Sequence, residues 1–319
     1  MNACSQASLE ESGYKLVWSD EFQEEGLPDP SKWGYQVEAN NWTHDRRHNE
    51  LQWYMAGRAA NSVVRDGKLV LTARREDWLT EPYTSARLLT KGRASWKYAR
   101  VDVRAKLPAG RPGVWPAIWL MPTDQRYGAW PESGEIDVME NVGFEPGVVH
   151  ATVHTAAYNH RIKTQIQATT RVPTAHDDFH VYSVEWNPDT IRCFVDGNAF
   201  FEFSRPGGGG ATEWPFDQRF HLILNVAVGG NWGGTMGIDP SAFPTTFEID
   251  YVRVYQTPAT HTQVVVPPRD LPPPVAKKAA VANHPDDDRP RRAPVDARPS
   301  SSTPLLPPPP PPPQRPPGL

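Results

Sequence analysis

The sequence predicts an all-β fold: a two-sheet antiparallel β-sandwich of the jelly-roll type, with one sheet bent into an open, concave cleft. Short runs rich in Val, Ile and aromatic residues recur along the chain, bounded by Gly, Pro, Asn and Asp. In YARVDVRAKL (98–107), apolar residues alternate with polar ones, which is the pattern of a half-buried strand. No segment has the repeat of a long amphipathic helix.

The strands follow from these runs in chain order. We expect them at residues 14–18, 68–74, 98–107, 114–120, 135–140, 149–155, 179–186, 191–195, 200–203, 221–228 and 247–255. The tripeptide VDG (195–197) lies between two of these runs and predicts a hairpin there.

Composition separates one folded unit from two flanking segments. All twelve Trp, and every Phe and Tyr, lie before residue 257. The last 62 residues hold 20 of the 35 Pro and no Phe, Trp or Tyr, so they cannot bury enough apolar surface to fold. We therefore expect a folded domain at 13–257, a disordered N-terminus at 1–12 and a Pro-rich disordered tail at 258–319.

Charge and hydropathy exclude several classes of partner. A net charge of −4 and a pI of about 6.2 give no reason to expect a nucleic-acid partner. No apolar run approaches the roughly 20 residues that a membrane span needs. Two cysteines make no disulfide framework, and we expect Cys193 to lie in a buried strand. The sequence specifies no oligomeric state, so a monomer is the default expectation.

Residues 134–141, GEIDVMEN, carry three carboxylates, Glu135, Asp137 and Glu140, at a spacing that no regular element aligns. On a flat strand Glu140 would face away from the other two, because side chains alternate between the two faces. One extra residue at Val138–Met139, a β-bulge, would return Glu140 to their face. We therefore expect all three acids in one cleft, with the outer carboxyl groups about 5–5.5 Å apart.

Carboxyl groups at that separation suit hydrolysis of a glycosidic bond with retention of configuration. One carboxylate attacks the anomeric carbon, and the other, protonated, releases the leaving group. Like charges disfavour joint ionisation, so crowding three acids raises the pKa of at least one. Asp137 can share a proton with Glu135. The other two interpretations are a solvated strand face and a Ca²⁺ site made by the three carboxylates.

Tryptophan is dense in the folded part of the chain, and several of these residues lie beside Gly, Pro or Asn. Trp115, Trp119, Trp130 and Trp232 are examples. A pyranose ring presents a flat apolar face to an indole and its hydroxyls at the edge, so such a group suits a sugar-binding surface. The alternative is that these residues simply pack the interior of a large sandwich.

These features together resemble glycoside hydrolase family 16, in its laminarinase-like branch of endo-β-1,3-glucanases. The resemblance is centred on WPESGEIDVMEN (130–141) and extends over nearly all of residues 14–257 in the family's order. It includes the segments KLVWSDEF (15–22), NELQWY (49–54), DGKLVLTAR (66–74), YTSARLLTKGR (83–93), YARVDVRAKLPAGRPGVWPAIWLMP (98–122), ATVHTAAYNH (151–160), FHVYSVEW (179–186), LILNVAVGGNWGG (222–234) and FEIDYVRVYQ (247–256).

The resemblance implies a jelly roll with retaining hydrolysis in its concave cleft. Glu135 matches the nucleophile, Asp137 the assisting acid and Glu140 the general acid/base. The ValMet pair before Glu140 matches the bulged form of the motif, which points away from strict β-1,3-1,4-glucan specificity. The resemblance also implies sugar contacts from Asn49, Arg87, Trp115, Trp119, Trp130, His154, Asn225 and Trp232. Structural roles stay open for Asn49, His154 and Asn225.

No cofactor is expected for catalysis, but many family members carry a structural Ca²⁺ on the convex side. By resemblance its ligands are Glu21, the carbonyl oxygen of Gly67, and Asp250. An acid such as Asp250, beside Ile249 and Tyr251 in a strand, supports a ligand role modestly. An ion there is distant from the three acids and would contribute stability only.

We expect a retaining endo-β-1,3-glucanase that acts on laminarin-type β-glucans. Mixed-linkage β-1,3(4)-glucan and agar or another galactan are alternative substrates on the same fold. Transglycosylation is an alternative reaction, and a glucan-binding lectin is the alternative outside enzymes. A polymeric substrate places the protein outside the cell or at its surface, although no complete signal peptide is visible in MNACSQASLEES.

Overall fold

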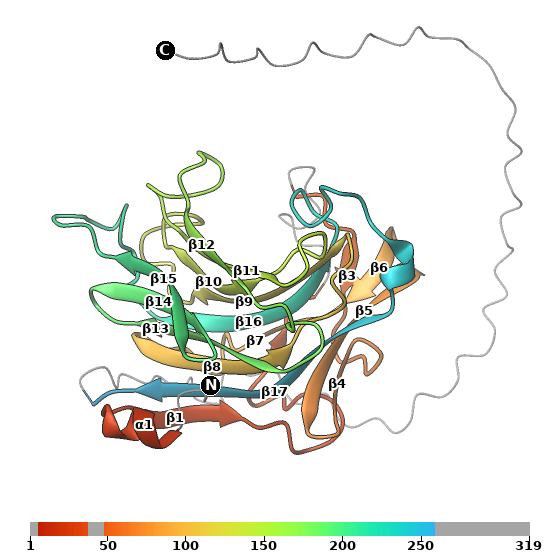
Figure 1. The fold of residues 1–319 in the computed structure, drawn as a ribbon, viewed down its shortest axis with the longest axis horizontal. Coiled ribbons are helices and arrows are strands. Elements are labelled where there is room, and N and C mark those ends of the chain that lie inside the picture. Colours follow the sequence, from red (N-terminus) through yellow and green to blue (C-terminus); the bar gives the residue numbers. More distant parts are fainter. Residues whose placement is uncertain (1–5, 38–47, 259–319) are drawn as a thin grey trace, which may run out of the picture. The chain divides into compact units, whose positions relative to one another are not determined.

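The computed structural model describes residues 6–37 and 48–258, which form two stacked β-sheets (Figure 1). One sheet, here the outer sheet, contains β1 (Lys15–Asp20), β3 (Gln52–Tyr54), β4 (Ser62–Arg65), β5 (Lys68–Trp78), β6 (Glu81–Ser85), β8 (Ala99–Lys106), β13 (His180–Trp186), β14 (Thr190–Val195), β15 (Asn198–Ser204) and β17 (Thr245–Gln256). The other, here the cleft sheet, contains β2 (Gly34–Tyr35), β7 (Arg87–Leu89), β9 (Val114–Pro122), β10 (Glu135–Glu140), β11 (Val148–His154), β12 (Ile166–Arg171) and β16 (Phe220–Val228).

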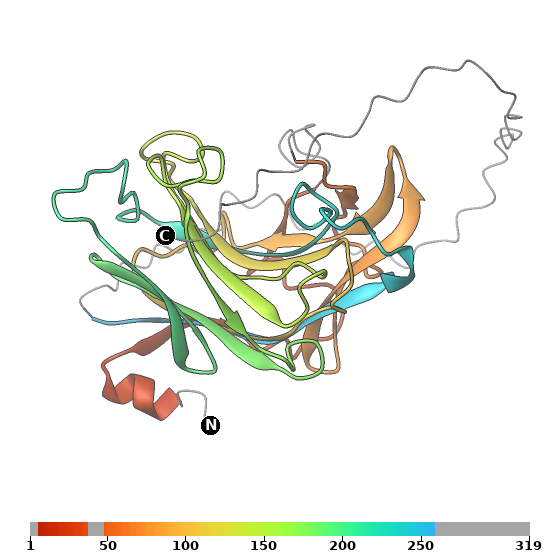
Figure 2. The ribbon, with the colours of Figure 1, turned by 45° about the horizontal axis from the view of Figure 1, so that its top comes forward.

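Each sheet brings together strands that are far apart in the sequence. The cleft sheet runs β12-β11-β10-β9-β16-β7-β2. The outer sheet runs β15-β14-β13-β8-β17-β5-β6-β3, with β1 beside β17 and β4 beside β5. Nearly every pair is antiparallel, and the short pair of β3 with β6 is parallel. The turned view in Figure 2 shows the strands of the cleft sheet crossing above the outer sheet. The predicted all-β, two-sheet sandwich is therefore confirmed.

All the strands that the sequence predicted are present. Their ends lie within two residues of the predicted ends, except that β5 continues four residues beyond the predicted end at 74. The predicted hairpin is also present: β14 pairs with β15, and Asp196 and Gly197 adopt the positive φ angles, 49° and 78°, of a tight turn. The sequence did not predict β2, β3, β4, β6, β7 and β12. These strands are short or, like β12, carry polar residues on an edge.

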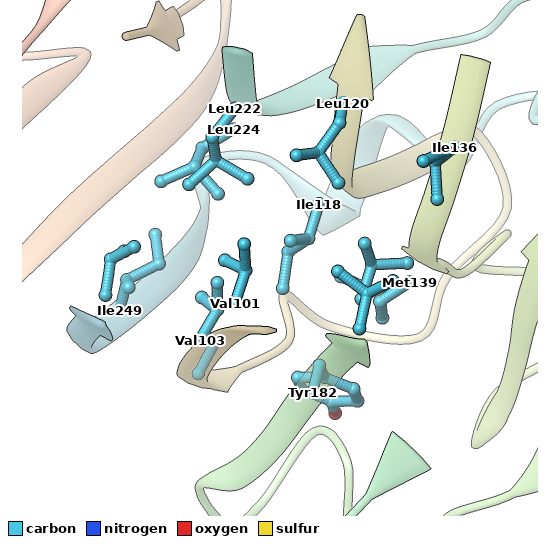
Figure 3. Packing of buried hydrophobic residues seen from close by; sticks show 14 of the residues in the cluster. Val101, Val103, Ile118, Leu120, Ile136, Met139, Tyr182, Leu222, Leu224 and Ile249 are labelled. Atoms are coloured by element: carbon cyan, nitrogen blue, oxygen red, sulfur yellow. The ribbon is translucent and has the colours of Figure 1, made fainter. Parts of the chain in front are cut away.

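The hydrophobic core lies between the two sheets (Figure 3). From the cleft sheet, Ile118, Ile136 and Leu224 point into it, and Val103 and Ile249 meet them from the outer sheet. Each of these side chains is fully buried. Burying a side chain of this size stabilises the fold by about 1.5–3 kcal/mol, which makes this layer the main source of stability. Cys193 is buried in the same core, as predicted, and its thiol is free.

The N-terminal segment differs in part from the expectation of disorder. Residues Gln6–Glu11 form the short helix α1, and Leu9 within it is buried. Gly13, at φ 84°, ends the helix, and the amide of Tyr14 donates back to the carbonyl of Leu9. Residues 1–5 and 259–319, including nearly all of the predicted Pro-rich tail, lie outside the described residues. In the part of the chain that the structure describes, no helix has the length and apolar character needed to cross a membrane.

Candidate active site

Strand β10 contains one residue more than its neighbours accommodate. Against β9, Asp137 pairs with Trp119 and Met139 with Ile118, so Val138 is the extra residue. The pairing of β10 with β11 shifts at the same place. This irregularity is the β-bulge that the spacing of the acids predicted.

The bulge divides the side chains of β10 between two environments. Its three apolar residues are buried in the core between the sheets. Its three carboxylates, Glu135, Asp137 and Glu140, line a cleft of about 650 Å³ on the other face of the same sheet. The register of one strand therefore brings all three acids into one groove.

Two indole groups hold the outer carboxylates. Trp130 Nε1 donates a hydrogen bond to Glu135 Oε2 at 2.5 Å, and Trp115 Nε1 donates to Glu140 Oε1 at 3.0 Å. Trp115 belongs to β9 and Trp130 to the segment that precedes β10, so the two donors reach the acids from different elements. Each hydrogen bond fixes a carboxylate and favours its ionised form.

Burial raises the pKa of all three acids, to different extents. The pKa of Glu135 rises to about 7 through burial, although hydrogen bonds from Asp137 and Trp130 oppose the rise. The pKa of Glu140 rises to about 8 through burial and the nearby charge of Glu135. Burial and both neighbouring charges raise the pKa of Asp137 well above its ordinary value. Near neutral pH, Asp137 therefore holds a proton that it donates to Glu135, and Glu135 ionises before Glu140.

His154 lies opposite Glu135 on β11, with Nε2 3.5 Å from Asp137 Oδ2. Burial and the nearby His160 lower the pKa of His154 to about 3, so its imidazole is neutral. Donor atoms of Glu135, Asp137 and His154 lie within 4.8 Å of one another, a grouping that can hold a metal ion. The N–H of Trp130 already points at Glu135, which favours a carboxylate that accepts hydrogen bonds over one that ligates a cation.

Tryptophan forms the side walls of the cleft. Trp115 and Trp232 meet edge to face with ring centres 5.5 Å apart, and both line the groove. On the Glu135 side, Trp130 lines the groove with the Arg161 guanidinium 4.5 Å from its ring centre. These indoles provide the apolar surfaces on which a sugar ring can stack.

A buried polar network forms one part of the floor. Trp119 Nε1 donates to Asn225 Oδ1 at 2.7 Å, and Asn225 Nδ2 donates to the Tyr54 hydroxyl at 3.2 Å. Arg87 donates to the same hydroxyl at 3.1 Å, and its guanidinium lies over the Tyr54 ring. Arg87, Trp119 and Asn225 all line the cleft while remaining at most 7% exposed. They present fixed polar groups to the groove from below.

Asn49 lies at the rim. It is exposed, its φ angle is 55°, and its Nδ2 donates to Asn231 Oδ1 at 2.6 Å. Asn231 lines the cleft. Asn49 therefore supports a residue of the groove wall from outside.

The sequence analysis did not single out several residues that line the cleft. Glu50 is the most buried of the charged ones, with Oε2 2.6 Å from the donor Gln52 Nε2 and 3.7 Å from Arg87 Nη2. Its position beside Asn49 in NELQWY was the available signal. The others are His48, Ala117, Met121, Glu145, His150, Thr152, His160, Arg161, Gln165, Gln167, Ala227 and Asn231.

The residues expected to bind Ca²⁺ lie on β17 itself or next to strands that pair with it. Asp20, next to Glu21, pairs with Val252, and Leu69, near Gly67, pairs with Ile249. The carboxylates of Glu21 and Asp250, however, form ion pairs. Glu21 accepts two hydrogen bonds from Arg253 at 2.9 and 2.8 Å, and Asp250 accepts one from Arg104. A cation held by these carboxylates must therefore compete with two guanidinium groups.

Comparison with known proteins gives one consistent family. The model of "Glycosyl hydrolases family 16" matches residues 48–253. The chain is 53% identical over 249 residues to a "Beta-glucanase" of Rhodothermus marinus, an alignment that covers 76% of this chain and 85% of that protein.

Solved structures agree with the sequence comparison. The laminarinase from Rhodothermus marinus superimposes with a TM-score of 0.73 at 53% identity and covers 76% of this chain and 97% of that one. SCLam, a non-specific endo-β-1,3(4)-glucanase from family GH16, superimposes with a TM-score of 0.72 at 46% identity and covers 77% and 92% of the two chains.

The Trp115 hydrogen bond predicts a change in the titration of Glu140. In Trp115→Phe the donor is lost, so the ionised form of Glu140 is less stable and its pKa should rise by about 1. The measurement is a ¹³C NMR titration of glutamate side-chain carboxyls, with Glu140 assigned through Glu140→Gln.

Trp232→Phe is the matched control, because Trp232 contacts the Trp115 ring without donating to Glu140. We expect the Glu140 titration to stay near the wild-type position in this variant. An unchanged pKa in Trp115→Phe contradicts the role of the indole N–H.

Proposed function

The chain belongs to glycosyl hydrolases family 16, and from this premise we propose that it is an endo-β-1,3-glucanase that hydrolyses laminarin-type β-glucans with retention of configuration. The observation that carries this proposal is the bulged β10, which aligns Glu135, Asp137 and Glu140 along one aromatic-walled groove. An open groove that crosses a sheet accepts a polymer along its length, which suits cleavage within a chain.

In the first step Glu140 donates its proton to the glycosidic oxygen while Glu135 attacks the anomeric carbon. The bond to the leaving sugar breaks and a glycosyl ester forms on Glu135. The order of the pKa values supports this division, since Glu140 keeps its proton to a higher pH than Glu135. Asp137 holds a proton next to Glu135 and stabilises the anion before the attack.

In the second step Glu140, now ionised, takes a proton from a water molecule that attacks the same anomeric carbon. The ester breaks, Glu135 leaves as a carboxylate, and the sugar is released with its original configuration. Neutral His154 next to Asp137 adds no positive charge to the trio, so it does not oppose the raised pKa of Asp137.

Mixed-linkage β-1,3(4)-glucan is the second candidate substrate. SCLam, which is 46% identical to this chain, is described as a non-specific endo-β-1,3(4)-glucanase. Both polymers present the same glucosyl ring to the indole walls, and the loops at the ends of the groove decide which linkage fits. Agar or another galactan, and binding without cleavage, are outcomes that the substrate test below distinguishes.

We further propose that the enzyme acts outside the cell or at its surface and works as a monomer. A β-glucan polymer does not cross a membrane, so the enzyme and its substrate meet outside. The groove is complete within one chain, which supports activity without a partner subunit.

The substrate prediction is tested with a panel of laminarin, lichenan, barley glucan, agarose and carrageenan. We expect reducing sugar from laminarin, less from the two mixed-linkage glucans, and none from the galactans. Glu135→Gln should lose activity by roughly 10⁴-fold because the nucleophile is absent, while still binding laminari-oligosaccharides.

Glu202→Gln is the matched control, since Glu202 is an exposed acid on β15, outside the cleft. Full activity of Glu135→Gln contradicts the assignment of the nucleophile. Tight laminarin binding with no released sugar favours a lectin, and longer products at high oligosaccharide concentration reveal transglycosylation.

The pH dependence follows from the two outer acids. Activity needs Glu135 ionised, so it rises as pH passes the Glu135 pKa of about 7, and it needs Glu140 protonated, so it falls as pH passes about 8. We expect a bell-shaped kcat/KM profile with a narrow maximum between these values. If both limbs of the profile lie below pH 5, where exposed carboxyl groups titrate, burial does not raise the pKa values of the two acids and the prediction is wrong.

We keep structural Ca²⁺ as a proposal, held by Glu21, the Gly67 carbonyl and Asp250. Because the ion must displace Arg253 from Glu21, we expect weak binding, with Tm rising only at roughly millimolar Ca²⁺. A chelator should reverse the rise without changing kcat, and Glu21→Gln should abolish it. A Tm that does not respond to Ca²⁺ contradicts the proposal.

A further inference from the structure

The cleft sheet continues for two strands beyond the catalytic strand. β11 pairs with β10, and β12 pairs with β11 as the edge strand of the sheet (Figure 1). Glu140 is paired with His150 on β11, and His150 is paired with Thr169 on β12. Glu140, His150 and Thr169 therefore form a row of paired residues that runs from the catalytic strand to the edge strand.

The side chains of β12 alternate regularly between the two faces. Gln167, Thr169 and Arg171 are exposed, and the residues between them are half-buried. Gln167 lines the catalytic groove, while Thr169 and Arg171 line a neighbouring open hollow of about 480 Å³. The same face of β12 therefore contributes residues to both the catalytic groove and the hollow.

The hollow lies beside the catalytic groove and shares two lining residues with it. Glu145, Pro146, Val148, His150, Thr169 and Arg171 line it. Glu145 and His150 belong to the groove as well, and His150 meets the Trp232 wall with ring centres 4.9 Å apart. The hollow therefore adjoins the groove at His150, which contacts Trp232 and is paired with Glu140.

The chemistry of the hollow suits a neutral sugar. Pro146 and Val148 supply an apolar patch, and polar side chains surround it. Glu145 Oε2 lies 3.1 Å from His150 Nε2. Within residues 6–37 and 48–258, the guanidinium of Arg171 has no ion pair or hydrogen bond, so its donors are available to a ligand. One acid, one arginine and one neutral imidazole balance in charge, which favours hydroxyl groups over an anion.

We propose that this hollow is a further subsite for glucosyl residues on the leaving-group side of the scissile bond, with Arg171 and Thr169 as its hydroxyl-binding groups. This subsite proposal rests on the proposed function, because the leaving-group side is defined by Glu140 as the group that protonates the leaving oxygen. Rings bound there hold the departing part of the polymer, so long chains are cleaved more efficiently than short ones.

The test follows where a laminarihexaose labelled at its reducing end is cut. Loss of a leaving-side subsite makes binding modes with many rings on that side less favourable. In Arg171→Ala and Thr169→Ala the labelled fragments should therefore become shorter by about one ring. The ratio of kcat/KM for hexaose to kcat/KM for p-nitrophenyl β-laminaribioside, whose leaving group is one aromatic ring, should fall about five- to tenfold.

Arg192→Ala is the matched control, because Arg192 is an exposed arginine on β14 of the outer sheet, and both readouts should equal those of the wild type. Wild-type fragment lengths in Arg171→Ala and Thr169→Ala, or equal losses on the hexaose and the bioside, overturn the subsite while leaving the glucanase assignment intact. No cleavage by the wild-type protein overturns the proposed function and the subsite with it.

Discussion

One extra residue in β10 is the constraint on which the site depends. With Val138 inserted, two consecutive residues, Val138 and Met139, face the core, and Glu140 returns to the face of Glu135. Burying both apolar side chains stabilises the bulge, because turning either one into the polar groove would expose it to water. The same packing that holds the sandwich together thus fixes the spacing of the acids along the groove.

Around that strand, burial and hydrogen bonding act in opposite directions on the acids. Removing the carboxylates from water raises the pKa of all three acids. At each outer acid, a hydrogen bond from an indole N–H stabilises the ionised form and limits this rise. The balance differs between Glu135 and Glu140, so two acids of the same chemical type can act as nucleophile and proton donor. The indoles that do this also line the groove, so in the proposed function binding and catalysis share the same side chains.

The cleft sheet continues on both sides of β10, and the two sides carry different side chains. Toward β9, β16 and β7 lies the buried network of Arg87, Trp119 and Asn225, which are linked by hydrogen bonds through Tyr54. Toward β11 and β12 lie exposed polar side chains with open space above them. In the proposed function, the hydrogen-bonded floor on one side of the scissile bond positions a sugar ring, and the open hollow on the other side accepts a long leaving chain.

The sequence by itself determined the strands with strong apolar patterns, the trio of acids and the bulge, because these depend on residues next to one another in the chain. It did not determine β12, whose run IQATTR is mostly polar because it lies at an edge, or the role of Glu50. Only the tertiary structure decided which groups meet. Asn225 bonds to Tyr54 across 171 residues, and Glu21 meets Arg253 across 232, which follows from sheet order and not from local pattern. That is also why the acids expected to hold calcium are found paired with arginines.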